Sequence, residues 1–249
     1  MAFATAPAPT GAVPPAPGRA GLLNTMSSEW TKLRTLRSTY WTLAVMVVVG
    51  VGLAIGICSA VSATWKSSSV GLDGASTSLS MFGILGPLIL MVLGSLVVTS
   101  EYSNGMIRTS LTAQPRRVQL FAGKLIVFTG VALITALVTS FLSFAIGQGI
   151  LSSTGESQSL SDPNVMRAVL GAALYVTVLG MMAYAIGTIL RHTAGTIATT
   201  AGLFFVLPMI TNFLPSSVQD DVMKWLPTAA AGPLLETVQT APSFFSPWT

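Results

Sequence analysis

Residues 101–117 read EYSNGMIRTSLTAQPRR, a polar segment between two long apolar stretches. The segment contains the bases Arg108, Arg116 and Arg117 but only one acid, Glu101. Membranes retain loops with an excess of Lys and Arg on the cytoplasmic side. The segment is therefore predicted to be a cytoplasmic loop, and this assignment sets the direction of the apolar stretches around it.

The composition indicates that lipid surrounds most of this chain. Only 8% of the residues are charged and 51% are hydrophobic, whereas soluble domains carry about 25% charged residues. The single cysteine, Cys58, lies inside an apolar run, so it cannot form an intrachain disulfide and lacks the companions of a metal site.

The apolar stretches predict an all-α integral membrane protein with five transmembrane helices, because about 20 apolar residues cross the hydrocarbon core. The expected spans are residues 41–63, 79–100, 124–150, 168–190 and 194–214. Pro87 interrupts the second span, which predicts a kink or an unwound turn, either as a hinge or for packing. The short turn Arg191–Thr193 predicts that the last two spans are antiparallel neighbours.

The flanking regions have a different character. Residues 1–24 are rich in Ala and Pro at their start and are interpreted as a disordered cytoplasmic tail rather than a signal peptide. Residues 25–249 form the predicted transmembrane domain. Within it, residues 215–249 are too rich in proline and too short of apolar length to span, so they predict short extracytoplasmic helices at the outer leaflet.

An amphipathic helix is expected from Ser27 to Tyr40, with Glu29 in its first turn, where the helix dipole favours an acid. Apolar residues recur at steps of three and four, which places them on or near one face; they are Trp30, Leu33, Leu36 and Tyr40. The bases Lys32, Arg34 and Arg37 accompany them. Such a helix would lie in the membrane interface; the alternative is a simple anchor for the first span.

The charges support a cytoplasmic N-terminus. Nine of the twelve Lys and Arg residues fall on segments predicted to be inside, and six of the eight acids fall outside. The inner bases are Arg19, Lys32, Arg34, Arg37, Arg108, Arg116, Arg117, Lys124 and Arg191. This bias follows the positive-inside rule and predicts a multi-pass protein of the cell membrane.

Several classes of membrane protein are disfavoured. No charge is expected in the interior of the five spans, and the only histidine, His192, lies at a predicted cytoplasmic turn. Ion-coupled transporters usually keep ionisable groups or broken-helix ion sites near mid-membrane, and intramembrane metalloproteases need His and carboxylate ligands. The chain also lacks the phosphate loop G-x-x-x-x-G-K-[ST]. Any uphill transport would therefore draw energy from another subunit.

The order of these elements resembles the membrane subunits of type-2 ATP-binding-cassette (ABC) exporters. The resemblance covers residues 26–249 and rests on two segments, SEWTKLR at residues 28–34 and the loop from Glu101 to Arg117. In that family a short helix in the first cytoplasmic loop, the coupling helix, docks on the ATPase subunit beside an N-terminal interface helix. The resemblance implies a coupling element made of Glu101, Tyr102, Asn104, Gly105, Met106, Ile107 and Arg108. It implies an interface helix containing Glu29, Trp30, Lys32, Arg34 and Arg37.

The function implied is that of a permease subunit, not an enzyme, in a dimer of such subunits with two cytoplasmic ATPases that bind ATP and Mg. Uncharged Ser, Thr, Gly and aromatic side chains would line a pathway for amphipathic or lipophilic cargo such as a drug, lipid or peptide. Family members usually have six spans, so a sixth is expected after Thr249. Two alternatives remain: a non-transporting scaffold or regulator that binds a cytoplasmic partner, and a lipid-modifying enzyme, for which no cluster of catalytic polar groups is found.

Overall fold

The computed structural model describes residues 21–64, 73–113, 116–155, 157–235 and 237. The described part of the chain is helical and contains no strand, and five of its helices are long and apolar enough to cross a membrane. This confirms the prediction of an all-α membrane protein with five candidate spans. The predicted tail lies almost wholly outside the described residues.

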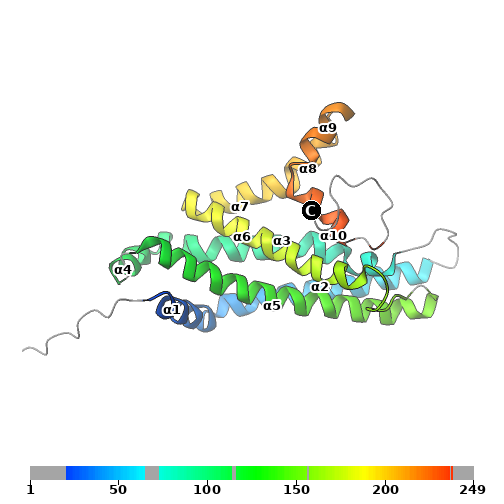
Figure 1. Ribbon diagram of the computed structural model, residues 1–249, viewed down its shortest axis with the longest axis horizontal. Helices are drawn as coiled ribbons and strands as arrows, with labels where there is room; N and C mark the ends of the chain where they lie inside the picture. Colours follow the sequence, from blue (N-terminus) through cyan, green and yellow to red (C-terminus); the bar gives the residue numbers. More distant parts are fainter. Residues whose placement is uncertain (1–20, 65–72, 114–115, 156, 236, 238–249) are drawn as a thin grey trace, which may run out of the picture.

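Four of the candidate spans run side by side in one bundle (Figure 1). They are α2 (Arg37–Thr64), α3 (Gly74–Ser103), α5 (Arg117–Leu151) and α6 (Val165–Leu190). Each is longer than its apolar stretch, because polar residues extend the helix at one or both ends. At the start of α3, for example, the Asp73 carboxylate accepts the N–H groups of Ala75 and Ser76 and caps the helix.

The core of the bundle lies where α3 and α6 meet, and a pair of glycines lets these helices approach closely. A Cβ atom added to Gly94 would lie 2.5 Å from the carbonyl oxygen of Gly180, closer than any real contact. Phe128 of α5 fills the space beside the glycines and stacks on Tyr184 with ring centroids 6.2 Å apart. Small residues allow this close packing of membrane helices.

Pro87 does not unwind α3, which is α-helical from Gly74 to Ser103. Of the two predicted alternatives, a kink or an unwound turn, the unwound turn is therefore wrong. The glycines beside the proline serve packing: a Cβ atom on Gly83 would clash with Leu235, and one on Gly86 would crowd Phe82 and Val176. Of these three partners, Leu235 belongs to α10, Val176 to α6 and Phe82 to α3 itself, which favours the packing interpretation over a hinge.

The fifth candidate span is built from three pieces: α7 (Thr193–Ala201), a π-helical turn (Gly202–Val206) and α8 (Leu207–Thr211). Pro208 explains the interruption, because proline has no N–H to donate to the carbonyl of Phe204. After a turn at Arg191 and His192, α7 returns beside α6 and also contacts α3. This agrees with the prediction that α6 and the fifth span are neighbours.

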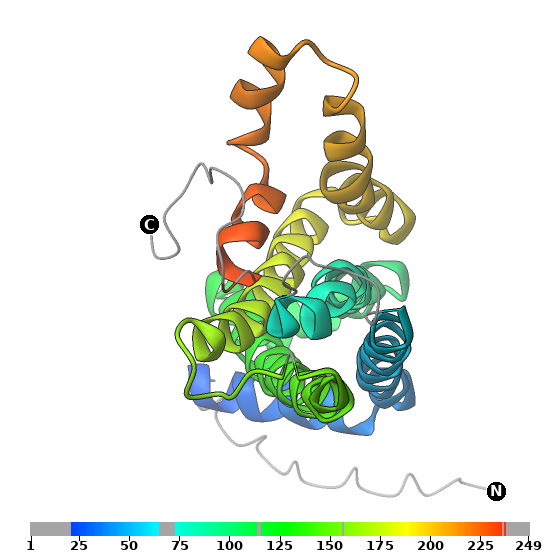
Figure 2. The same ribbon diagram turned by 90° about the vertical axis from the view of Figure 1, so that its right-hand side faces the viewer.

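Short helices follow the fifth span. They are α9 (Ser216–Met223), a 3-10 turn (Pro227–Ala230) and α10 (Ala231–Leu235). Helices α8 and α9 extend away from the bundle, whereas α10 returns to pack on α6 and α3 (Figure 2). The return is held by Arg167, which donates to the carbonyl of Pro233 at 2.7 Å, and by Asp73, which accepts the N–H of Thr237 at 2.7 Å. A further 3-10 turn, Ser152–Thr154, ends α5.

Candidate functional site

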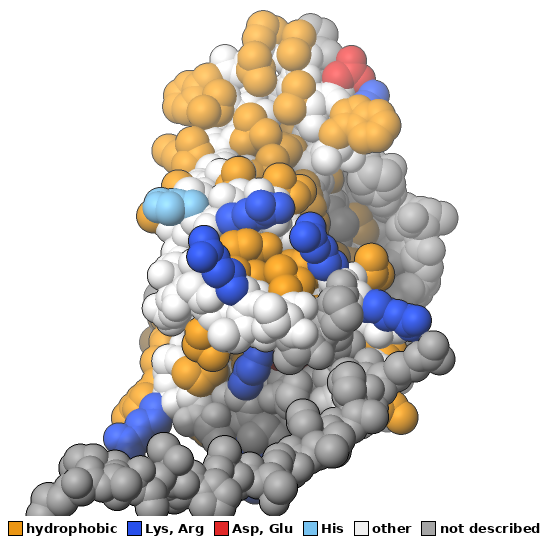
Figure 3. Space-filling view, turned by 90° about the vertical axis from the view of Figure 1, so that its left-hand side faces the viewer, with side chains coloured by type: hydrophobic (Ala, Val, Ile, Leu, Met, Phe, Trp, Pro, Cys, Tyr) orange, Lys and Arg blue, Asp and Glu red, His pale blue; other side chains and the backbone are white. Residues whose placement is uncertain are grey.

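One end of the bundle collects most of the exposed bases of the described residues. Figure 3 shows Lys and Arg side chains spread over this face, around a patch of apolar side chains. The exposed bases of this end are Arg34, Arg37, Arg108, Arg116, Arg117 and Arg191. They come from segments far apart in the sequence, so the fold gathers them on one surface that suits an acidic partner or anionic lipid headgroups.

Two short helices border this end: α1 (Leu22–Thr35) and α4 (Met106–Ala113). Helix α1 differs from the predicted helix at residues 27–40. It begins five residues earlier and ends before Leu36, whose extended backbone separates it from α2. Glu29 therefore lies in the middle of α1 and not in its first turn. Arg37 and Tyr40 belong to α2.

Most residues of the predicted apolar stripe are exposed in the structure. Trp30, Leu36 and Tyr40 are half or more exposed, and only Leu33 is buried. The face of α1 that packs on α5 consists instead of Thr25, Glu29 and Leu33, which recur at steps of four. The sequence pattern missed this face because its central residue is an acid.

Most residues of the predicted loop from Glu101 to Arg117 belong to helices in the structure. Glu101 and Tyr102 belong to the last turn of α3 and not to a separate loop. Asn104 ends α3, and Gly105 adopts a left-handed backbone with φ of 70°, which only glycine adopts without strain. Met106, Ile107 and Arg108 then begin α4, where Ile107 is half-buried and its two neighbours are exposed. Pro115, near the end of the predicted loop, lies outside the described residues.

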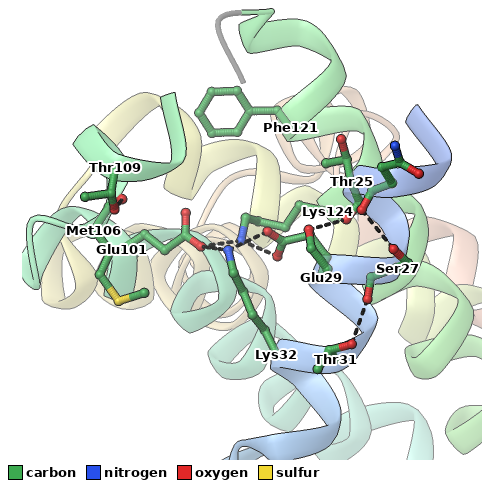
Figure 4. Close-up of polar contacts among 12 residues, drawn as sticks. Thr25, Ser27, Glu29, Thr31, Lys32, Glu101, Met106, Thr109, Phe121 and Lys124 are labelled. Carbon is green, nitrogen blue, oxygen red and sulfur yellow. Dashed lines mark hydrogen bonds and ion pairs between the residues drawn. The ribbon is translucent and has the colours of Figure 1, made fainter. Parts of the chain in front are cut away.

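A closed ring of four ion pairs joins three of these elements (Figure 4). Glu29 of α1 accepts from Lys32 at 2.7 Å through one oxygen and from Lys124 of α5 at 2.6 Å through the other. Glu101 of α3 accepts from both lysines through Oε1, at 3.0 Å from Lys32 and 2.8 Å from Lys124. Its Oε2 atom is buried and has no hydrogen-bond partner among the described residues.

Burial makes this ring sensitive to the loss of any member. Glu29, Glu101 and Lys124 are all buried, and only Lys32 is partly exposed. Charges removed from water are tolerated when opposite charges and hydrogen bonds surround them, and one unpaired member is costly. The ring therefore holds α1, the end of α3 and the start of α5 in one arrangement.

Lys32, the partly exposed residue of the ring, carries its positive charge at neutral pH. Burial by itself lowers the pKa of Lys32, but its hydrogen bonds to Glu29 and Glu101 outweigh burial and raise the pKa above the ordinary value of 10.5. A group with a raised pKa contributes stability below its ordinary pKa and loses it as the pH rises through the folded value. Lys32 is thus a cation under all physiological conditions.

The turn between α6 and α7 is also tied to this end. The guanidinium of Arg191 lies 5.6 Å from the centre of the Tyr102 ring, within the range of a cation–π contact. The Thr193 hydroxyl donates to the Thr99 hydroxyl at 2.8 Å. These contacts connect the end of α3 to the start of the fifth span.

Sequence reasoning did not place Lys124, Arg191 or Thr193 in the site. A signal existed for Lys124, because it is the one base inside a long apolar stretch and a buried base needs an acid. Its partners could not be identified, because they lie 95 and 23 residues away in the chain. Among the described residues, no group of three His, Cys, Asp or Glu side chains could hold a metal ion.

Comparison with known proteins identifies the family. No protein of curated function and no solved structure gave a significant match. The family described as ABC-2 family transporter protein matches residues 25–210, which include α1, the ring of ion pairs, α4 and the candidate spans through α7. This is a family of membrane permeases that lack ATPase motifs and work with ATPase subunits. Since the match covers most of the 249 residues, the chain belongs to the ABC-2 transporter family.

Proposed function

We propose that the chain is the permease subunit of an ATP-driven exporter, and that its basic end receives the force of ATP hydrolysis from a separate ATPase. In this proposal α4 and the preceding residues from Glu101 are the coupling element, and α1 is the interface helix. ATP and Mg are bound by the ATPase, the basic end faces the cytoplasm, and two permease subunits form the pathway.

The ring of ion pairs is the observation that carries this proposal. Glu101 lies five residues before Met106, the first residue of α4, and is bonded to Lys32 of α1 and Lys124 of α5. A push on α4 would therefore reach the ends of α3 and α5 and move α1 with them. A flexible solvated loop could not transmit such a displacement, because its charges would lose their contacts with little cost.

The surface chemistry of α4 agrees with a docking role. Met106, Arg108 and Thr109 are exposed, whereas Ile107, Ser110 and Leu111 form the half-buried face. One side of the helix is thus available to a partner while the other rests on the protein. An exposed methionine and arginine are typical of protein interfaces, where both residue types are enriched.

We also propose a second permease subunit and a class of cargo, as the resemblance to the family implies. The fifth candidate span is the least buried of the five, with 17% of its apolar window inside the chain. Its exposed apolar side chains, including Val206, Met209 and Ile210, offer surface to a second permease subunit. We propose an amphipathic or lipophilic cargo, because few charged side chains are available to line a pathway between such subunits.

Co-purification tests the proposal. The tagged chain is extracted in mild detergent from its native host, and the proteins retained with it are identified by mass spectrometry and assayed for ATP hydrolysis. We expect an ATPase subunit near one-to-one with the wild-type chain. Arg108→Glu should release it, because the substitution reverses an exposed charge without removing a buried contact. Lys224→Glu, which reverses a base on the far side of the fifth span, should not.

A second variant examines the turn. Gly105→Ala forces a side chain into the left-handed backbone and should misdirect α4, with loss of the ATPase. Purification of the wild-type chain with no ATPase would contradict the proposal and favour a scaffold that binds another cytoplasmic partner. So would normal export by both variants.

A further inference from the structure

A cavity of about 470 Å³ lies at the basic end, between α1, α2, α3, the start of α4 and α5. Such a volume falls within the range of roughly 300–1,000 Å³ found for small-molecule sites. The lining is mostly apolar, with Leu36 from the α1–α2 break and Leu93, Leu96 and Val97 from α3. The ring of ion pairs forms its charged wall, and the exposed hydroxyl residues Thr35 and Ser38 also line it.

The charged wall presents a cation to the cavity. The side chain of Lys32 is 35% exposed, whereas those of Glu29 and Lys124 are 4% exposed and that of Glu101 is 8% exposed. An ammonium group has three N–H donors, and within the described structure Lys32 uses one on Glu29 and one on Glu101. Figure 4 shows these two contacts. The third donor remains available to an anion.

An apolar groove continues the cavity along the bundle. The groove has a volume of about 370 Å³ and lies between α2 and α3, lined by Trp41, Thr42, Val45, Leu88, Ile89 and Val92. Thr42 lines both spaces. On α3 the linings of the two spaces continue at helical spacing through Leu88, Val92, Leu96 and Ser100, which recur every four residues and share one face.

The depth of this combined site matches one leaflet of a bilayer. Leu88 precedes Glu101 by 13 residues, or about 20 Å of helix at ~1.5 Å per residue. Half of a hydrocarbon core ~30 Å thick is ~15 Å, and the headgroup region adds a few ångströms more. A charged head placed at Lys32 would therefore carry a tail that ends near Leu88.

We propose that the cavity and groove together bind one glycerophospholipid of the adjoining leaflet, with its phosphate on Lys32 and an acyl chain between α2 and α3. The unused donor of Lys32 at one end and the apolar lining at the other complement the two halves of such a molecule. A segment of a soluble ATPase would not suit the groove, which runs along two candidate membrane spans. The lipid would brace α1 against α2 and α3 beside the ring. Asn104 and Met106 of the proposed coupling element also line the cavity, so the lipid and the ATPase would occupy adjoining surfaces.

The test measures lipid retention by the full chain, purified with its bound subunits in dodecyl maltoside. Native mass spectrometry follows titration with dioleoylphosphatidylglycerol or with dioleoylglycerol, which has the same tails and no phosphate. We expect one phospholipid per chain and at least about tenfold weaker binding of dioleoylglycerol, because a charge-assisted hydrogen bond is lost. Lys32→Gln should weaken phospholipid binding by a similar factor, and Lys32→Arg should retain it.

A second pair of variants tests the groove without touching the ion pairs. Thr42→Trp places a large ring where the two spaces join and should reduce phospholipid binding. Ile134→Trp, at an exposed position of α5 outside both spaces, is the matched control and should bind as the wild type does. Equal binding of the two lipids, or unchanged binding by Lys32→Gln and Thr42→Trp, would overturn the proposal. Binding that occurs only after the ATPase is removed would overturn it as well and would identify the ATPase as the occupant.

Discussion

Lys124 holds two carboxylates that are almost fully removed from solvent, and it is the buried cation of the ring. Replacing Lys124 by Met leaves Glu29 and Glu101 with only the partly exposed Lys32 between them. We expect Lys124→Met to lower the free energy of unfolding by roughly 3–5 kcal/mol, as for other buried ion pairs that lose one partner. The measurement is thermal unfolding of the purified protein in detergent.

A double variant separates the ion pair from side-chain packing. Lys124→Met combined with Glu101→Gln removes one charge of each sign, so it should be more stable than Lys124→Met alone. Lys224→Met provides the control, because its pair with Asp221 is exposed and should contribute nothing measurable. If the double variant were less stable than Lys124→Met alone, the unpaired charge of Glu101 would not be the cause of the lost stability.

Asp73 joins the start of α3 to the residue after α10, and this contact should respond to acid. Burial by itself raises the pKa of Asp73, but hydrogen bonds from Thr237 and Ser76 outweigh burial and hold the pKa below 3.8. The stability it contributes is complete above pH 3.8 and is lost as the pH falls through the lower folded value. Asp73→Ala should therefore cost about 1 kcal/mol or more at pH 7, as for other lost caps.

Melting temperatures measured between pH 7 and pH 3 check this expectation. The gap between the wild type and Asp73→Ala should narrow as the pH falls below 3.8, since the unfolded chain then binds a proton at Asp73 before the folded chain does. Asp73→Asn keeps a capping oxygen and should lie between the two at pH 7. A gap that is constant over this range would show that the charge of Asp73 plays no part.

At the scale of elements, the contact between α3 and α6 depends on the absence of a side chain at Gly94. In Gly94→Ala the new Cβ atom would lie 2.5 Å from a backbone oxygen of Gly180, which cannot move aside as a flexible side chain could. We expect a loss of roughly 1–3 kcal/mol, as for other overpacked cores. Thermal unfolding in detergent measures it.

Gly130→Ala is the matched control for this helix contact. Gly130 lies on the exposed face of α5, and an added Cβ atom there meets nothing within 4 Å. Alanine favours a helix over glycine by roughly 0.5–1 kcal/mol, so this variant should be at least as stable as the wild type. Similar losses in both variants would mean that glycine is required for reasons other than close packing.

For the whole molecule, the distribution of charge predicts that the basic end faces the cytoplasm. Single cysteines placed at Thr109 and Ser161 test the two ends, because both positions are exposed and lie at opposite ends of the bundle. In intact cells a membrane-impermeant maleimide should label Ser161→Cys, whereas Thr109→Cys should be labelled only after permeabilisation. The reverse result would invert the topology and place α4 out of reach of a cytoplasmic ATPase.

The native cysteine does not complicate this experiment. Cys58 is completely buried, so the parent chain should remain unlabelled in both conditions. Cys58→Ala provides a cysteine-free background if detergent exposes the thiol.

The sequence by itself determined the class of protein and the number of candidate spans. These features depend on local composition and length, because a helix that crosses lipid must be apolar over about 20 residues whatever its neighbours are. The bias of bases toward one set of loops is likewise local information. The resemblance to ABC-2 permeases rested on two short segments, and the family match covers them both.

Only the tertiary structure decided how the ends of the helices are joined. The sequence placed Glu29 and Lys32 on a surface helix and Glu101 in a polar loop, but it could not bring Lys124 between the two acids. Ion pairs between residues 95 positions apart leave no periodic pattern in the chain. They form because packing of α1 on α5 removes water from the carboxylates, which must then be neutralised by whichever bases the fold supplies.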